Sequence, residues 1–311
     1  MAGRPIGLTD YVSPEAERER IRRTLYRADA SARAVVLPKY QPAWSERELA
    51  RYRDDGYVAM ERIFSAGEIA TAKAALTDLA QRRTSNGRVE FQEEPYYSEG
   101  GRDDRVDDPE LRLRVIRNFC QAEARLSALA SHPRLRVLVD GLIGDGHALL
   151  QDTALLKPAY HGAEKPWHQD AAYFDQSPID AVIGVWIALD PATVENGCMQ
   201  IVPGTHRSGP VRHYHVRDCQ IEDARVAVDR AIVVPLQPGG ALFFSALLHH
   251  GTPPNSGPDR RRAVQFHFRS AHCRTMTFDE HAALFDDDGA YAGCRAWELG
   301  PDRRRTVSTR A

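Results

Sequence analysis

The sequence predicts a mainly β fold with added α-helices, in which a jelly-roll core is flanked by N-terminal helices. Residues 147–275 contain short apolar or alternating runs, separated by turn signals such as Glu195-Asn196-Gly197 and Pro203-Gly204. Residues 46–146 instead show apolar side chains at helical spacing. Because a parallel α/β sheet needs a helix between successive strands, strands without intervening helices favour a sandwich or barrel.

Six strands are expected in this core. Each is a short run rich in β-branched, aromatic or other apolar side chains, bounded by Gly, Pro or Asn. The expected strands are His147–Leu156, Val182–Leu189, Met199–Val202, Ala231–Pro235, Ala241–Phe244 and Ala263–Phe268.

The helices before the core begin at capping signals. Ser45-x-x-Glu48 and Ser65-x-x-Glu68 are capping-box patterns, in which a hydroxyl and a carboxylate satisfy free N–H groups at a helix start. Tyr57–Met60 predicts a short strand between these two helices. Two more helices are expected, over Glu123–Ala130 and Pro133–Ile143.

The two ends of the chain carry charged segments. Ser13-Pro14-Glu15 predicts a surface helix running to about Ala28. The expected organisation is an N-terminal helical extension (1–45), one domain (46–300) and a basic tail (301–311). That domain would comprise a helical part (46–146), the jelly-roll core (147–275) and a C-terminal helix (276–300) that includes Asp279–Phe285.

Composition excludes several classes of protein. The formal net charge is −2 over 311 residues, so a dominant basic surface for nucleic acid is not indicated. No run reaches the roughly 18 apolar residues of a membrane span, and the first nine residues contain no apolar signal core. We therefore expect a cytoplasmic monomer or homodimer that acts on a small molecule, with no nucleic-acid partner and no membrane span.

The cysteine pattern points to the same compartment. Cys120, Cys198, Cys219, Cys273 and Cys294 are odd in number, widely spaced and never arranged as C-x-x-C. This pattern argues against a disulfide framework or a zinc ribbon, and it predicts free thiols in a reducing environment.

Several catalytic motifs are absent from the sequence. It contains no G-x-G-x-x-G after a strand and no G-x-x-x-x-G-K-[ST], so nucleotide-binding loops are not predicted. It also lacks H-E-x-x-H and G-x-S-x-G, which disfavours zincin and α/β-hydrolase chemistry.

A metal-binding pattern is present instead. In His168-Gln169-Asp170, the two outer side chains point to the same side of an extended or turning backbone. A third ligand is expected about eighty residues on, at His249-His250-Gly251, where an apolar strand ends. Two histidines and one carboxylate on one face leave coordination positions open, which is the arrangement of non-haem Fe(II) oxygenases.

An arginine cluster follows the distal histidines. Arg260-Arg261-Arg262 opens the last predicted strand, about ten residues after His250. A guanidinium there could hold a carboxylate through two parallel hydrogen bonds. His267, further along the same strand, could also face the pocket.

Together these blocks resemble the phytanoyl-CoA dioxygenase family of Fe(II)/2-oxoglutarate-dependent oxygenases. The resemblance covers residues 150–270 strongly, residues 45–140 loosely and residues 1–45 not at all. The family spacing, with an arginine eleven residues after the distal histidine, selects His250 over His249 and Arg261 over its neighbours. The matching blocks are His168-Gln169-Asp170, Trp186–Asp190, Glu195–Met199, Pro203–His206 and His250-Gly251-Thr252 through Ala263.

The resemblance implies a double-stranded β-helix, or cupin-like, core and a role for each matching residue. His168, Asp170 and His250 would bind Fe(II) and carry the catalysis. Four residues would contact 2-oxoglutarate: Arg261 at its C5 carboxylate, with Thr252, Trp186 and Thr153. Gln151 would contact substrate, and Lys157 is a further pocket candidate. From the residues alone, Trp186 is equally explained as a core aromatic and Thr252 as a turn cap.

The implied activity is hydroxylation of an unactivated C–H in a small or medium metabolite, using O2 and 2-oxoglutarate and releasing succinate and CO2. Asp170 favours oxidation over halogenation, because related halogenases carry a small residue in its place. The oxidation would be hydroxylation, or else desaturation, epoxidation or ring closure. A role in tailoring secondary metabolites is expected. Residues 84–110, which predict a long acidic loop, and residues 206–230 would cover the site. The alternatives are a cupin-like metal-binding protein and a non-redox isomerase, neither of which requires Arg261.

Overall fold

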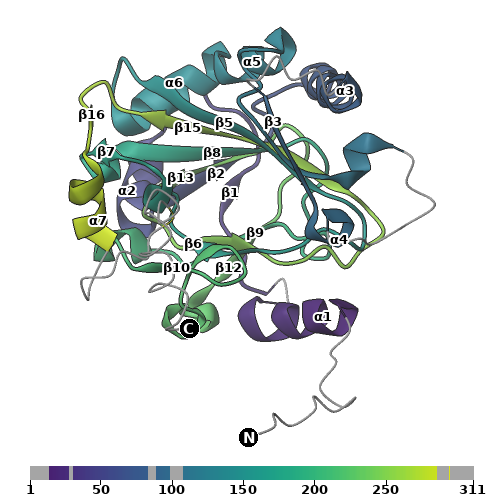
Figure 1. Cartoon of the computed structure of the whole chain (residues 1–311). Helices are drawn as coiled ribbons and strands as arrows, with labels where there is room; N and C mark the ends of the chain where they lie inside the picture. Colours follow the sequence, from purple (N-terminus) through teal and green to yellow (C-terminus); the bar gives the residue numbers. More distant parts are fainter. Residues whose placement is uncertain (1–13, 28–30, 83–88, 99–107, 286–293, 295–311) are drawn as a thin grey trace, which may run out of the picture.

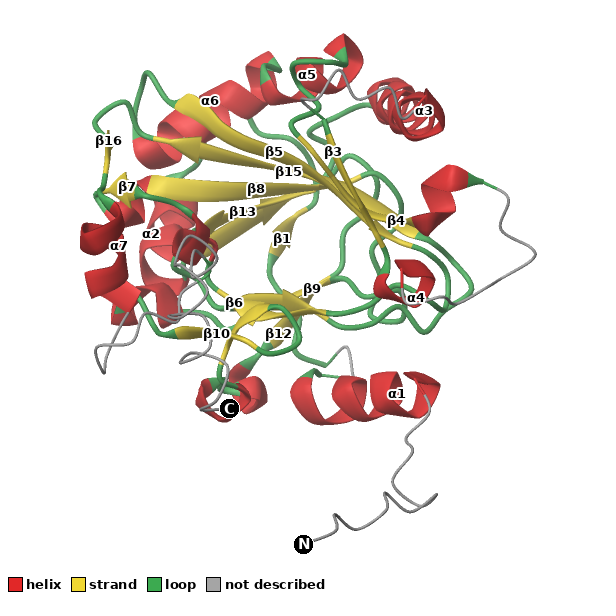
Figure 2. Cartoon of the chain, viewed as in Figure 1, coloured by secondary structure: helices red, strands yellow, loops and turns green. Residues whose placement is uncertain are grey.

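The computed structural model describes residues 14–27, 31–82, 89–98, 108–285 and 294. Within them, a large and a small β-sheet face each other, and helices cover the outer side of the large sheet (Figures 1 and 2). The predicted jelly-roll architecture with flanking helices is therefore confirmed. The space between the two sheets holds the site described below.

The large sheet has eight strands, which are antiparallel except for the pair β1 and β2. In spatial order they are β1 (Val36–Leu37), β2 (Tyr57–Met60), β13 (Ala241–Ser245), β8 (Val182–Ala188), β15 (Arg261–Arg269), β5 (Ala148–Lys157), β4 (Leu113–Arg117) and β3 (Glu90–Glu93).

The small sheet has four strands, and two further two-stranded pairs belong to neither sheet. Its order is β12 (Ile232–Val234), β9 (Met199–Ile201), β14 (His250–Thr252) and β6 (Lys165–His168). The pairs are β10 (His213–His215) with β11 (Cys219–Ile221), and β7 (Gln176–Ser177) with β16 (Arg274–Thr275).

Two of the described α-helices, α2 and α3, begin where the capping signals predict them. Ser45 and Glu48 form a reciprocal capping box, and Ser65 pairs with Glu68 in the same way. None of the helices in the described ranges is long and apolar enough to cross a membrane. The helices are α1 (Pro14–Leu25), α2 (Glu46–Asp55), α3 (Ala66–Arg82), α4 (Pro95–Ser98), α5 (Ala124–Ala130), α6 (Pro133–Ile143) and α7 (Phe278–Phe285).

Strand alternation divides the interior into two cores. Successive side chains of a strand point to opposite faces of its sheet. Phe243 therefore packs with the helices on the outer face of the large sheet, whereas Phe244 packs against the small sheet. On β15, Val264 and Phe266 face the helices, so that Gln265 and its alternate neighbours point between the sheets.

The structure corrects three expectations about organisation. Residues 84–110 are not one long loop, because their described parts form β3, α4 and a short 3-10 helix, Pro109–Arg112. The helical part also contributes β4, and β1 of the N-terminal extension joins the large sheet. These short strands lack a strong apolar signature, and neighbouring strands complete their hydrogen bonding. The tail 301–311, and residues 286–300 apart from Cys294, lie outside the described residues.

The expectation of five free thiols is wrong. Cys219 of β11 and Cys294 form a disulfide, with Cα atoms 5.3 Å apart, whereas Cys120, Cys198 and Cys273 are free. The two bonded residues are 75 positions apart in the sequence. Folding brings them together, and no local spacing pattern could have revealed this pair.

Gly184 on β8 makes room for the ring of Phe244, which in turn packs against His250 with ring centroids 4.7 Å apart. A Cβ at Gly184 would lie 2.7 and 2.9 Å from the two Cε atoms of Phe244. Gly184 and Phe244 are both buried, so the ring of Phe244 has no free space into which it could move. We expect Gly184→Ala to lower the free energy of unfolding by about 1–3 kcal/mol, as overpacking does, measured by urea denaturation.

Gly67 provides the matched control. It lies in the first turn of α3, and a Cβ there would have no neighbour within 4 Å. Gly67→Ala should leave stability unchanged or raise it by up to about 1 kcal/mol, because alanine is the better helix former. Equal stability of the two variants would contradict the account of Gly184.

Candidate active site

Three side chains converge where β6 and β14 pair in the small sheet. His168 ends β6, His250 begins β14, and the two are direct partners in the antiparallel register. Asp170 follows at the start of a 3-10 turn. Its Oδ1 lies 3.3 Å from His168 Nε2 and 3.5 Å from His250 Nε2. The ligand atoms of the three residues all lie within 4.8 Å of one another, and all three residues are buried.

Hydrogen bonds fix the tautomer of both histidines. His168 Nδ1 lies 2.8 Å from the carbonyl oxygen of Pro166, and His250 Nδ1 lies 2.9 Å from that of Leu248. A carbonyl oxygen can only accept, so each Nδ1 carries the proton and donates it. Each Nε2 therefore presents a lone pair toward Asp170. Three acceptor atoms that converge without a proton between them fit a bound cation.

The second oxygen of Asp170 is held from the large sheet. Asp170 Oδ2 accepts hydrogen bonds from Gln265 Nε2 at 3.0 Å and from His267 Nε2 at 2.7 Å. Both donors point inward from β15. Support of this kind orients a ligating carboxylate and leaves its other oxygen, Oδ1, directed at the metal position.

The electrostatics of the site favour the metal-binding protonation states. Burial, reinforced by the neighbouring His250, lowers the pKa of His168 to about 4. Burial alone would raise the pKa of Asp170, but the imidazoles of His250 and His267 hold it well below its usual range. At neutral pH His168 is therefore neutral and Asp170 is a carboxylate. Together with His250 they form the two-histidine, one-carboxylate donor set that suits Fe(II).

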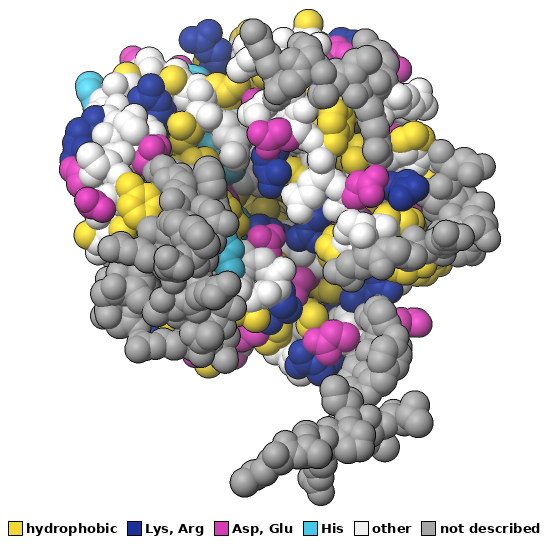
Figure 3. Space-filling model, in the orientation of Figure 1, with side chains coloured by type: hydrophobic (Ala, Val, Ile, Leu, Met, Phe, Trp, Pro, Cys, Tyr) yellow, Lys and Arg dark blue, Asp and Glu magenta, His cyan; other side chains and the backbone are white. Residues whose placement is uncertain are grey.

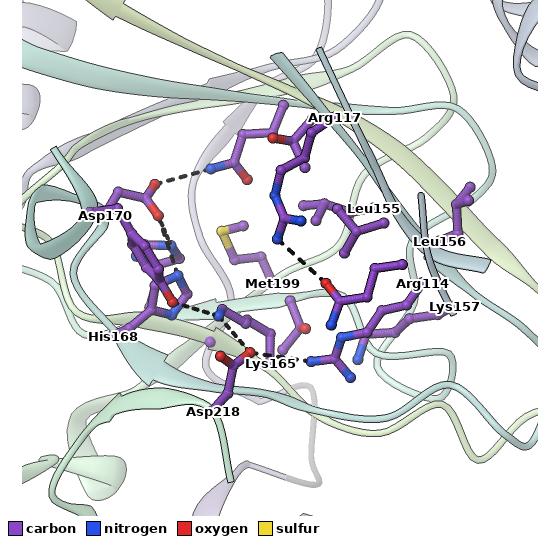
Figure 4. A pocket seen from close by; sticks show the side chains of 18 of the residues that line it. Arg114, Arg117, Leu155, Leu156, Lys157, Lys165, His168, Asp170, Met199 and Asp218 are labelled. Carbon is purple, nitrogen blue, oxygen red and sulfur yellow. Dashed lines mark hydrogen bonds and ion pairs between the residues drawn. The ribbon is translucent and has the colours of Figure 1, made fainter. Parts of the chain in front are cut away.

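These residues open into a pocket of about 190 Å³ between the two sheets. Figure 4 shows His168 and Asp170 on one side of it, with charged side chains around the remaining wall. In Figure 3, basic and acidic side chains lie side by side around the hollow at the centre of this face.

Arg261 lies on the wall of this pocket with its charge uncompensated at close range. It is 1% exposed, and its Nη1 and Nη2 make only long contacts, 3.3 and 3.4 Å, to the carbonyl oxygens of Leu155 and Gly197. Its buried Nε has no hydrogen-bond partner in the described part of the chain. Burial lowers the pKa of Arg261 to about 10, so it stays charged at neutral pH. Such a group fits the carboxylate of a ligand.

The other predicted residues divide into two groups. Thr252, Thr153, Gln151 and Lys157 all line the pocket. Lys157 donates hydrogen bonds to the carbonyl oxygens of Ala163 and Pro253, the latter at 2.8 Å. Trp186 lies behind the pocket wall instead, with the Arg261 guanidinium 5.3 Å from its ring centre. Its ring would pack against the guanidinium and hold Arg261 in position.

Comparison with known proteins places this arrangement in a family. Residues 52–263 match the phytanoyl-CoA dioxygenase (PhyH) family, which is more than half of the chain. The chain belongs to the PhyH family. The metal triad, Arg261 and all the strands between them fall within the matched region.

The chain is also similar, over most of its length, to individual proteins. Rat phytanoyl-CoA dioxygenase domain-containing protein 1 is 25% identical over 264 residues, covering 73% of this chain and 90% of its own. Ectoine dioxygenase of Sphingopyxis alaskensis is 27% identical, covering 75% and 80%. The solved non-heme alpha-ketoglutarate-dependent epimerase SnoN, from nogalamycin biosynthesis, matches with a TM-score of 0.57 and 25% identity, covering 78% and 89%.

Sequence reasoning missed part of this PhyH site. Gln265 was not singled out, although it lies between Arg261 and His267 on β15 and alternation puts all three on one face. Lys165 and Tyr173 were also missed. They line the pocket and are joined by a 2.8 Å hydrogen bond from Lys165 Nζ to the Tyr173 hydroxyl. Lys165 lies on β6, where it pairs with Thr252 of β14, and Tyr173 lies in the 3-10 turn that follows β6.

A buried histidine supports the loop that carries the triad. His213 Nε2 accepts a hydrogen bond from the backbone N–H of Gln169 at 2.9 Å, and burial lowers the pKa of His213 to about 3. Between about pH 6.5 and 3 the unfolded chain therefore binds a proton that the folded chain does not. We expect the free energy of unfolding to fall as pH drops through this window, by up to about 1.4 kcal/mol per pH unit.

Urea denaturation between pH 7.5 and 5 tests this expectation. His213→Gln should show a shallower loss of stability with falling pH than the wild type. His215→Gln, at the exposed end of the same strand, should retain the wild-type slope. The account of His213 fails if both variants and the wild type share one slope.

Proposed function

We propose that this chain is an Fe(II)/2-oxoglutarate-dependent dioxygenase that hydroxylates an unactivated C–H of a small or medium metabolite. The observation that carries the proposal is the combination of the triad with Arg261. The triad presents two Nε2 lone pairs and one carboxylate oxygen, and Arg261 offers a buried cation without a carboxylate partner in the described residues. A metal site alone would not require that arginine.

The residues of the chain have separate tasks in this proposal. His168, Asp170 and His250 would hold the iron, while Gln265 and His267 keep Asp170 in place. Arg261, supported by Trp186 and with Thr252 and Thr153 nearby, would hold 2-oxoglutarate, and Gln151 would face the substrate. When bound, iron and 2-oxoglutarate together supply O2-dependent oxidation, with succinate and CO2 as coproducts. The side chains of the triad and of Arg261 are buried, which limits their contact with water.

The type of oxidation is proposed on narrower grounds. Asp170 occupies the carboxylate position, which supports oxygenation over halogenation. Two proteins to which the chain is similar, ectoine dioxygenase and the epimerase SnoN, carry different reaction names, so similarity alone does not select the type of reaction. SnoN comes from nogalamycin biosynthesis, which supports a role for this chain in tailoring secondary metabolites.

A cytoplasmic location and a monomer or homodimer are part of the same proposal. Three of the five cysteines are free thiols, as is common in a reducing compartment. The Cys219–Cys294 pair makes the location testable, because thiol labelling of the protein in intact cells reports whether that bond is present. A fully reduced pair would support the cytoplasm, and a fully oxidised pair would oppose it.

Turnover of the cosubstrate tests the proposed activity. Purified protein with Fe(II), 2-oxoglutarate and O2 should form succinate slowly on its own and faster with a metabolite that fits the pocket. Omission of iron or O2 should stop succinate formation. Metal binding without any succinate, across a library of candidate metabolites, would favour the cupin-like alternative without oxygenase activity.

A further inference from the structure

A second arginine on the pocket wall, Arg117 of β4, also lacks a carboxylate partner in the described part of the chain. Its Nη2 lies 3.5 Å from the amide oxygen of Gln92, at the limit of a hydrogen bond. Glu90 is its register partner on β3, but that carboxylate accepts a hydrogen bond from Asn118 at 3.3 Å. Among the residues described, no carboxylate oxygen lies within ion-pair distance of Arg117.

The other cations of the pocket wall are already engaged. Arg114 lies 3.7 Å from Glu94 and 3.6 Å from Asp218, and Lys165 lies 2.7 Å from Asp218. Lys157 donates to two backbone carbonyls. With Arg261 assigned to 2-oxoglutarate, Arg117 is the remaining positive charge on the described pocket wall without an acceptor at close range.

The sheet register places Arg117 opposite the metal site. Arg117 pairs with Thr153, and Thr153 pairs with Gln265, which holds Asp170. Two strand spacings, about 10 Å, therefore separate the backbones of Arg117 and Gln265. Figure 4 shows the Arg117 side chain pointing into the pocket, with Asp170 across from it. Arg261 lies four residues before Gln265 on β15, so the backbones of these two residues are about 13 Å apart.

We propose that Arg117 binds a carboxylate of the substrate, so that the substrate class is a small organic acid. The inference rests on the proposed function and narrows it. A partly desolvated guanidinium gains most from an anion that it can grip through two parallel hydrogen bonds. A ligand anchored at Arg117 would extend across the pocket toward the metal triad. The pocket volume of about 190 Å³, part of which 2-oxoglutarate would fill, suits a small molecule.

Calorimetric titration of the protein loaded with Fe(II) and 2-oxoglutarate, without O2, tests this inference. The probes are linear carboxylates from butanoate to octanoate and their matched primary amides. Saturating 2-oxoglutarate keeps the acids away from Arg261. The wild type should bind at least one acid about 10- to 100-fold more tightly than its amide, the range for a hydrogen bond to a charged group. Arg117→Gln should remove this preference.

Arg136→Gln is the matched control, because Arg136 is an exposed arginine on α6, outside the pocket. It should retain the preference for the acid. Equal affinity for acid and amide in the wild type, no binding of any acid, or an unchanged preference in Arg117→Gln would overturn the inference. So would loss of 2-oxoglutarate binding in Arg117→Gln alone, which would assign this arginine to the cosubstrate.

The same samples also test the proposed function, through a second and independent measurement. The charge-transfer absorption of iron with 2-oxoglutarate reports on the oxygenase centre, and calorimetry reports on Arg117. Absence of the absorption in the wild type would contradict the proposed function. The difference between Arg117→Gln and Arg136→Gln would still decide whether Arg117 binds the acid.

Discussion

His250→Ala is expected to lower succinate formation by more than about 100-fold and to weaken Fe(II) binding by a similar factor. Loss of a group that only supports a metal ligand costs about 10- to 100-fold in affinity or activity, and loss of a ligand itself should cost more. His250 Nε2 is one of the three converging donor atoms, and its other nitrogen is fixed by Leu248. The measurements are Fe(II) titration and the rate of succinate release.

His249→Ala is the control for this prediction. His249 is the preceding residue and is also buried, yet it is not a member of the triad, and its Nε2 has no hydrogen-bond partner among the described residues. Its removal should leave Fe(II) affinity within a few-fold of the wild type. Loss of iron binding in His249→Ala with retention in His250→Ala would exchange the roles of the two histidines.

The second large effect is expected at Arg261. Arg261→Gln should raise the KM for 2-oxoglutarate by about 10- to 100-fold or more, because it removes a charge-assisted, two-pronged contact to a carboxylate. Fe(II) binding should be unchanged, since no atom of Arg261 belongs to the metal triad. Steady-state kinetics at varied 2-oxoglutarate, together with Fe(II) titration, separates the two effects.

The neighbouring arginine provides the comparison. Arg260 is not available to bind 2-oxoglutarate, because its Nη2 forms an ion pair with Glu110 Oε1 at 2.8 Å. Arg260→Gln should leave the KM for 2-oxoglutarate near the wild-type value. If Arg260→Gln raised that KM as much as Arg261→Gln did, the assignment of the cosubstrate arginine by spacing would be wrong.

The sequence was most informative where apolar strands are long. The expected strands over 147–156, 182–189 and 263–268 correspond to β5, β8 and β15, which form the centre of the large sheet. The triad was also accessible, because two of its members are two residues apart and the third follows a strongly apolar strand. The resemblance to a family supplied the choice between His249 and His250.

Other features depend on contacts that no local pattern encodes. β14 and β6 are short strands, yet their pairing is what aligns His168 with His250. β4 alternates charged and apolar residues in a segment expected to be helical or looped, so the position of Arg117 on the pocket wall was not predicted. The Cys219–Cys294 bond joins positions 75 residues apart. Each of these features is set by tertiary packing.

Anaerobic titration of the metal-free protein with Fe(II), and then with 2-oxoglutarate, tests the central claim most directly. The account predicts a visible charge-transfer absorption in the wild type that is absent in His250→Ala and needs far more 2-oxoglutarate in Arg261→Gln. Tight Fe(II) binding with no absorption at any 2-oxoglutarate concentration would contradict it, because the triad would then hold a metal that does not meet the cosubstrate.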